Sequence, residues 1–274
     1  MSYLARYEAG EHERVWTELR ALGAAALNAE HLADARNVAD ATMRRALSNL
    51  QRIEAGLRAI GYVFETSAPP PLDPGRALSA TRLAAEETVL GLGLDPAMTA
   101  QLLASLDQTL GPAAGNSNEN AAGQRVRASA LGDPHLHLDQ LDRFERLAGP
   151  APLALGSFWR TVGWVDFTGT LPVTVIRGPL ILMPPVTLAD DYEAHVEDNG
   201  GDAGFAIELV ADADGDELDP LIAVPVTSGA DARLPDGEWF VDYLRGATRA
   251  AGLPGMAVDA IPGLANIAAD WEPF

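Results

Sequence analysis

The sequence predicts an α+β protein: an N-terminal helical hairpin and further helices come first, and an antiparallel β-sheet domain flanked by helices follows. Two helical stripes of apolar residues near the N-terminus indicate the hairpin. In the C-terminal half of the chain, short apolar runs separated by glycine, proline and aspartate are typical of strands. Because these strands do not alternate with helices, we expect them to pair antiparallel. The expected regions are a helical hairpin at 1–65, a linker and helical region at 66–132, and an α+β domain at 133–274.

The hairpin is predicted from two narrow apolar stripes whose members recur every three or four residues. The first stripe consists of Val15, Leu19, Leu22 and Ala26. The second consists of Met43, Ala46, Leu50, Ile53, Leu57 and Ile60. Such stripes in neighbouring helices most simply pack against each other, and Gly61 stands where the second helix is expected to end.

Region 66–132 opens with a proline-rich stretch, residues 68–75, that is typical of a stiff linker. Helices are predicted at 77–90 and 95–111, the second from an Asp-Pro start and a Gly-Pro end. A polar, aromatic-free loop is expected at 115–124.

The α+β domain is expected to begin with a helix that starts at the Asp139 cap and ends at Gly149. An aromatic helix follows and ends at Gly163, and a final helix runs from Asp236 to Gly252. Between these helices the predicted strands are 172–176, 180–183, 205–210 and 221–226.

Composition removes several kinds of chemistry. The chain has 274 residues and a formal charge of −20; its 19 basic residues are all arginine, and it contains no lysine and no cysteine. Lysine Schiff bases, cysteine nucleophiles, disulfides and thiolate metal sites are therefore excluded. No serine lies in a nucleophile elbow, and no glycine-rich phosphate loop follows a predicted strand. We expect no catalytic residues and no cofactor.

The N-terminus carries no apolar signal region, and no apolar run approaches the roughly 18 residues of a membrane span. A cytoplasmic protein is therefore expected, without membrane contact.

The negative charge is concentrated in the C-terminal half. Residues 1–60 are neutral overall, residues 151–274 carry a net charge of −15, and the stretch 190–219 holds 12 acids and no arginine. Such a field repels nucleic acid and attracts a basic protein or a divalent cation. Acidic runs are also typical of solvated loops, so both interpretations stay open. The candidate partner-binding residues are Asp190, Asp191, Glu193, Glu197, Asp198, Asp212, Asp214, Asp216, Glu217 and the aromatic Trp164.

One short segment allows a metal site as an alternative. In a strand, His135, His137 and Asp139 would share a face, a spacing used by binuclear hydrolases. Those enzymes need further histidines, and the residues after Asp139 instead indicate a capped helix with both histidines at its entrance.

Three runs in the C-terminal half resemble the SUKH superfamily (Smi/Knr-type proteins) over roughly residues 135–255. Residues 153–169, with the sequence LALGSFWRTVGWVDFTG, resemble the family's entry helix and the turn before its sheet. The runs DPLIAVP at 219–225 and WFVDYLR at 239–245 resemble a strand and the terminal helix of the same arrangement. The resemblance implies an antiparallel sheet with flanking helices and no catalytic residues. Bacterial members are commonly immunity proteins that neutralise a toxin, often a nuclease.

The sequence thus supports three functional hypotheses. The first is an immunity or antitoxin-type protein that binds a basic partner through an aromatic-containing groove near the sheet and the acidic region. The second is a metal-dependent hydrolase centred on His135, His137 and Asp139. The third is a scaffold protein that oligomerises through its N-terminal hairpin, since the sequence leaves the oligomeric state open.

Overall fold

The computed structural model describes residues 2–65, 127–172, 174–201, 204–207, 209, 222–223, 229–234 and 237–274. Residues 1–65 and 126–274 belong to one compact unit. The hairpin and the α+β region, expected as separate domains, are therefore packed together. The linker, the helices at 77–90 and 95–111 and the loop at 115–124 lie outside the described residues.

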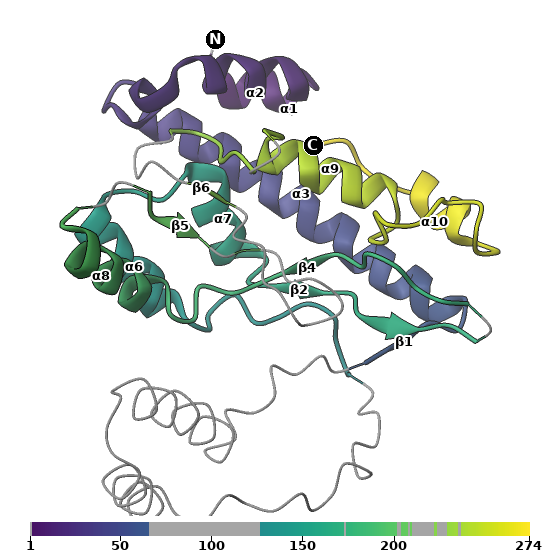
Figure 1. The fold of residues 1–274 in the computed structure, drawn as a ribbon. Helices are drawn as coiled ribbons and strands as arrows, with labels where there is room; N and C mark the ends of the chain where they lie inside the picture. The colour runs from purple at the N-terminus through teal and green to yellow at the C-terminus, as the bar shows by residue number, and fades with distance from the viewer. Residues whose placement is uncertain are drawn as a thin grey trace, which may run out of the picture. The chain divides into compact units, whose positions relative to one another are not determined.

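A long helix, α3, occupies the centre of the helical layer (Figure 1). The helical elements in the first part of the chain are α1 (Tyr3–Glu8), α2 (His12–Ala21), the short 3-10 helix η1 (Gly23–Leu27) and α3 (Leu32–Ala59). Three helices from the C-terminal half also contact α3: α7 (Leu153–Thr161), α9 (Phe240–Arg249) and α10 (Leu264–Ala269).

The two predicted helices of the hairpin are present, the first shorter than expected, but α3 packs mainly against α7 and α1 rather than against α2. Helix α3 contains the second stripe as far as Leu57, and Gly61 adopts the left-handed φ of 89° that commonly follows a helix. Helix α2 ends at Ala21, and Ala26 lies in η1. Helix α3 packs most extensively against α7, and its stripe residues from Met43 to Leu57 are buried. These stripe residues are therefore covered by other parts of the chain.

The α+β class is confirmed, with strands that are short and paired antiparallel. The described pairs are β1 (Val63–Phe64) with β3 (Gly169–Thr170), β2 (Val165–Asp166) with β4 (Ile181–Leu182), and β5 (Ala206–Ile207) with β6 (Ile222–Ala223). Main-chain hydrogen bonds join these strands to neighbouring segments: Asp166 N of β2 donates to Ala130 O, and Met183 N, just after β4, donates to Leu209 O, which follows β5.

Three of the four predicted strands each contain one observed strand, namely β4, β5 or β6, whereas the described residues of 172–176 contain none. In the part of 172–176 that is described, only an isolated bridge between Leu171 and Thr174 is present. The sequence analysis missed β1, β2 and β3. Strand β1 comes from the N-terminal region yet pairs with β3, which ties the N-terminal segment to the sheet region.

Two further helices, α6 (Leu138–Ala148) and α8 (Leu188–Asn199), pack against each other beside the strands (Figure 1). Helices α6, α7 and α9 lie close to their predicted positions, whereas α8 occupies a stretch expected only as an acidic region. None of the helices in the described ranges combines the length and the apolar character needed to cross a membrane.

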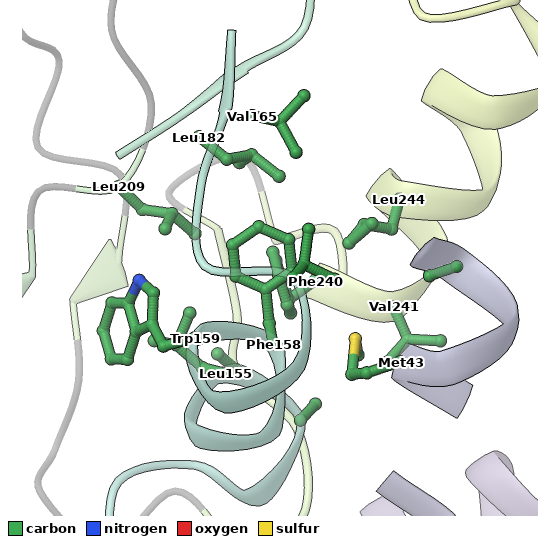
Figure 2. Packing of buried hydrophobic residues seen from close by; sticks show 14 of the residues in the cluster. Met43, Leu155, Phe158, Trp159, Val165, Leu182, Leu209, Phe240, Val241 and Leu244 are labelled. Atoms are coloured by element: carbon green, nitrogen blue, oxygen red, sulfur yellow. The ribbon is translucent and has the colours of Figure 1, made fainter. Parts of the chain in front are cut away.

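The core lies where α3, α7, α9 and the strands meet. Figure 2 shows Met43 of α3, Phe158 of α7 and Phe240 of α9 among the buried side chains. Phe158 and Phe240 meet edge to face, with ring centroids 5.5 Å apart and an interplanar angle of 86°. One aromatic contact thus joins helices that are about eighty residues apart in the sequence.

Candidate partner-binding groove

A groove of about 340 Å³ lies between the segment before α8 and strand β5. We call it the 183–191 groove. Its lining consists of Trp159, Met183, Pro184, Pro185, Val186, Thr187, Leu188, Asp191, Phe205, Ala206 and Ile207. The described lining is mostly apolar, and Asp191 is the one carboxylate among these residues.

Hydrogen bonds and prolines fix the wall of this groove. The indole Nε1 of Trp159 donates to Met183 O at 3.0 Å, and Met183 N donates to Leu209 O at 2.7 Å. Two prolines follow, each with a restricted φ, and Val186 N donates to Pro184 O at 2.9 Å. The chain between β4 and α8 is therefore held in one shape. Val186 in this segment is 44% exposed.

An aromatic cluster attaches α8 to the rest of the groove. Phe205 contacts Tyr192 edge to face at a centroid distance of 5.1 Å, and Tyr192 contacts Phe144 of α6 in the same way at 5.4 Å. His195 lies against Phe205 at 5.5 Å. These contacts place the acidic outer face of α8 next to the groove.

Arg143 of α6 neutralises two of the five acids of α8. Its guanidinium donates to Asp190 and to Glu193, and these hydrogen bonds and charges raise the pKa of Arg143. Gln140 Nε2 also donates to Asp190, at 3.2 Å. Asp190 and Glu193 therefore serve mainly to hold α8 on α6.

The remaining acids of α8 have no cationic partner among the described residues. Asp191 accepts a hydrogen bond from Thr187 Oγ1 at 2.6 Å and lines the groove. Glu197 and Asp198 are exposed, and they form no ion pair with the described residues. Asp191 and Asp198 are seven residues apart and so lie on one face of α8. Among the described residues, these three carboxylates are the part of the predicted acidic surface that forms no ion pair.

The other predicted contacts do not join this surface. Asp212, Asp214, Asp216 and Glu217 lie outside the described residues. Trp164 is absent from the described lining of the groove and packs elsewhere. The Arg127 guanidinium lies 5.0 Å from its ring centroid, and a Cβ on Gly132 would overlap its indole.

The geometry also differs from that required by the metal hypothesis. His135 and His137 lie in a turn rather than a strand, so the alternation that would place them on one face with Asp139 is not formed. His137 has a left-handed φ of 66° at the start of α6, which agrees with the helix-entrance interpretation. Among the described residues, no three histidine, aspartate or glutamate side chains are grouped so that they could hold a metal ion.

A second, smaller hollow of about 190 Å³ lies between α3 and α7. Ser157 Oγ donates to Asp40 Oδ1 at 2.6 Å there, with Arg36 and Arg160 also in the lining. The described lining includes no histidine that could act as a general base for the serine. This polar pair links two helices, and the sequence carried no signal for it because its members are 117 residues apart.

Sequence reasoning also missed the double proline that shapes the groove wall. Pro184 and Pro185 between two apolar residues were a usable signal, because consecutive prolines stiffen a surface segment.

No model of a known protein family, no curated protein and no solved structure matches this chain.

Proposed function

We propose that this chain is a non-enzymatic protein-binding module that holds a basic segment of another protein in the 183–191 groove. The observation that carries the proposal is that an apolar groove and an acidic helix share residues, since Leu188 and Asp191 line the groove and belong to α8. The aliphatic stem of an arginine or lysine side chain fits the apolar wall, while its charged end reaches the carboxylates.

Electrostatics supports a basic partner in particular. Asp191, Glu197 and Asp198 have no cation of their own chain to neutralise them among the described residues. The chain as a whole carries a charge of −20. Charges of this kind speed the encounter with a basic surface, whereas the apolar anchors determine how slowly the complex separates.

The SUKH resemblance extends the proposal to an immunity or antitoxin role. A nuclease that holds a polyphosphate backbone presents a basic surface, and such a surface is complementary to α8 and the groove. In this role the chain would neutralise the toxin by covering that surface, with no reaction of its own.

The proposal is tested by photo-crosslinking followed by affinity measurement. A photoreactive amino acid in place of Val186 should crosslink to the proteins that contact the groove in the native host. The same amino acid in place of Val258, which is similarly exposed, measures crosslinking that does not depend on the groove. The partner isolated only through position 186 is then measured with purified variants. Val186→Arg should weaken its binding by about tenfold or more, because it fills the groove with a bulky positive charge.

Two comparisons make the result specific. The double variant Glu197→Lys and Asp198→Lys should slow association, and the difference should shrink as salt is added. Val258→Arg, which places the same charge far from α8 in the sequence, should leave both rates unchanged. A partner that binds equally well to Val186→Arg and to the wild type would contradict the proposal.

A further inference from the structure

The last residues of the chain lie against α3 and α9 in the manner of a bound peptide. After α10 the chain runs back beside α9, where the C-terminus lies (Figure 1). Asn49 of α3 holds the main chain of Glu272 with two hydrogen bonds: Asn49 Nδ2 donates to Glu272 O, and Glu272 N donates to Asn49 Oδ1, both at 2.8 Å. Arg45 Nη1 donates to Pro273 O at 3.0 Å. Main-chain recognition of this kind is how proteins hold short extended peptides.

Two aromatic side chains anchor this segment, residues 271–274, which we call the tail. Phe274 is 1% exposed and Trp271 is half-buried, and their ring centroids are 6.1 Å apart. Each ring lies near an arginine of α9: Arg249 is 4.7 Å from the Trp271 centroid, and Arg245 is 5.8 Å from that of Phe274. Arg245 Nε also donates to Phe274 O.

The surface under the tail is basic, although the chain as a whole is strongly acidic. Arg45 and Arg52 lie 3.6 and 3.7 Å from the carboxylate of Glu272. Asn49 and these two arginines follow one another on one face of α3, because they are spaced four and three residues apart. The site therefore selects an acidic residue between two aromatic ones.

The tail does not fill the whole site. A cavity of about 390 Å³ continues beside Pro273 and Phe274 towards α2, and its lining includes His12 and Arg245. Arg245 is buried, with its side chain 5% exposed, and its Nη2 makes no hydrogen bond with the described residues. A donor without an acceptor in a buried position favours a ligand that brings one.

We propose that the face between α3 and α9 is a binding site for short acidic, aromatic peptides of the Trp-Glu-Pro-Phe type, and that the chain's own tail is its resident ligand. An incoming peptide of this class displaces residues 271–274 from the site. The proposal is independent of the 183–191 groove, which selects basic segments and lies on other elements.

The test uses the full chain with its two anchors removed, Trp271→Ala together with Phe274→Ala. The probe is a fluorescein-labelled peptide of residues 269–274, Ala-Asp-Trp-Glu-Pro-Phe, followed by fluorescence anisotropy. The double variant should bind it at least about tenfold more tightly than the wild type, because an attached tail competes at an effective concentration in the millimolar range. A peptide with both aromatic residues replaced by alanine should not bind.

Asn49→Ala in the same background should weaken binding by about tenfold, because both main-chain hydrogen bonds are lost. Asn37→Ala, at an exposed position of the same helix, is the matched control and should have no effect. Circular dichroism confirms that each variant is folded. A folded double variant that does not bind the peptide, or that binds it equally well with and without Asn49, would overturn the proposal.

A second measurement keeps the wild-type anchors and does not depend on how the double variant folds. The chain has no cysteine, so Pro273→Cys creates a single labelling position, and Pro273 is exposed while its contact to Arg45 uses only the main chain. A spin label there should be immobile in the free protein and should become mobile when excess unlabelled peptide displaces the tail. A label that stays immobile at saturating peptide counts against displacement.

Discussion

The pKa of the buried carboxyl group of Asp231 is set by two opposing effects, loss of hydration and attraction to an arginine. It is 1% exposed and lies in the segment 229–234. Arg20 of α2 donates to it at 2.9 Å, and the N–H of Ala232 does the same at 2.9 Å. Asp242 of α9, which shares Arg20, adds a nearby negative charge. Loss of hydration outweighs the attraction of Arg20, so burial raises the pKa of Asp231 from 3.8 to about 6.

This shift predicts how stability depends on pH. The folded chain holds the Asp231 proton more tightly than the unfolded chain does, so protonated Asp231 favours the folded state. Its contribution is fully present below about pH 4 and is lost as the pH rises to about 6, with a total on the order of 3 kcal/mol at most. In urea unfolding across this range, the stability of the wild type relative to Asp231→Asn should therefore fall with rising pH. The exposed control Asp259→Asn should show no such trend, and a pH-independent difference for Asp231→Asn would refute the prediction.

Among the helices and strands, those marked by apolar spacing and by end residues in the sequence could be predicted. Those that form only because a distant part of the chain packs against them could not. Helices α6, α7 and α9 follow from apolar spacing and from glycines or prolines at their ends. Helix α8 was missed because its buried face is narrow, with only Leu188, Ala189 and Tyr192 buried among many acids. Strands of two residues give too short an alternation to be recognised, and β1 exists because β3 is available to pair with it.

The glycine that follows α9 could be recognised from the sequence, but its close contact with the sheet region is seen only in the folded chain. Gly252 was predicted as a helix stop, and it has a left-handed φ of 76°. A Cβ there would lie 2.2 Å from the ring of Phe167, and Gly252 O accepts the N–H of Leu180 at 2.9 Å. The helix itself ends at Arg249, and Ala251, with a φ of 52°, is the first left-handed residue after it. Gly252 N closes the turn by donating to Ala247 O at 2.8 Å, and the absence of a Cβ there lets the turn approach Phe167.

Gly246 inside α9 and Gly252 just after it should therefore respond to alanine with opposite signs. Gly252→Ala should lower the free energy of unfolding by about 2 kcal/mol or more, because it combines an unfavourable φ with overlap in the core. Gly246→Ala, at an exposed position inside the helix with nothing near its Cβ, should raise it by about 0.5–1 kcal/mol. Denaturant unfolding of the two variants beside the wild type measures both effects, and equal signs would contradict this account.

At the scale of the whole molecule, charge is unevenly distributed in space as well as in the sequence. The N-terminal segment is internally paired: Arg6, for example, bonds both Glu11 and Glu18. Helix α8 depends on one arginine, Arg143, for its ion pairs within the described residues. Repulsion between acidic side chains is therefore expected to lower the stability of the folded chain. Dissolved salt screens this repulsion.

The melting temperature should accordingly rise when sodium chloride is increased from about 20 mM to about 500 mM. Arg143→Gln should strengthen this salt response, because it leaves Asp190 and Glu193 without their cation. Arg14→Gln makes the same change in net charge on the well-paired N-terminal segment and should have a smaller effect. A melting temperature that falls with salt would show that attraction between ion pairs outweighs the repulsion.

The α+β class, the positions of most helices, the acidic character of the region around α8 and the absence of lysine and cysteine chemistry could all be predicted from the amino-acid sequence. Each of these depends on composition or on residues within a few turns of one another. Three features follow only from the packing of the folded chain: helices from both halves contact α3, Arg143 forms ion pairs with Asp190 and Glu193, and a groove lies beside Asp191. The same packing also brings Asn49 to the tail, 223 residues away. Contacts of this kind depend on how helices and strands pack, because no periodicity or spacing in a single sequence specifies which distant residues will meet.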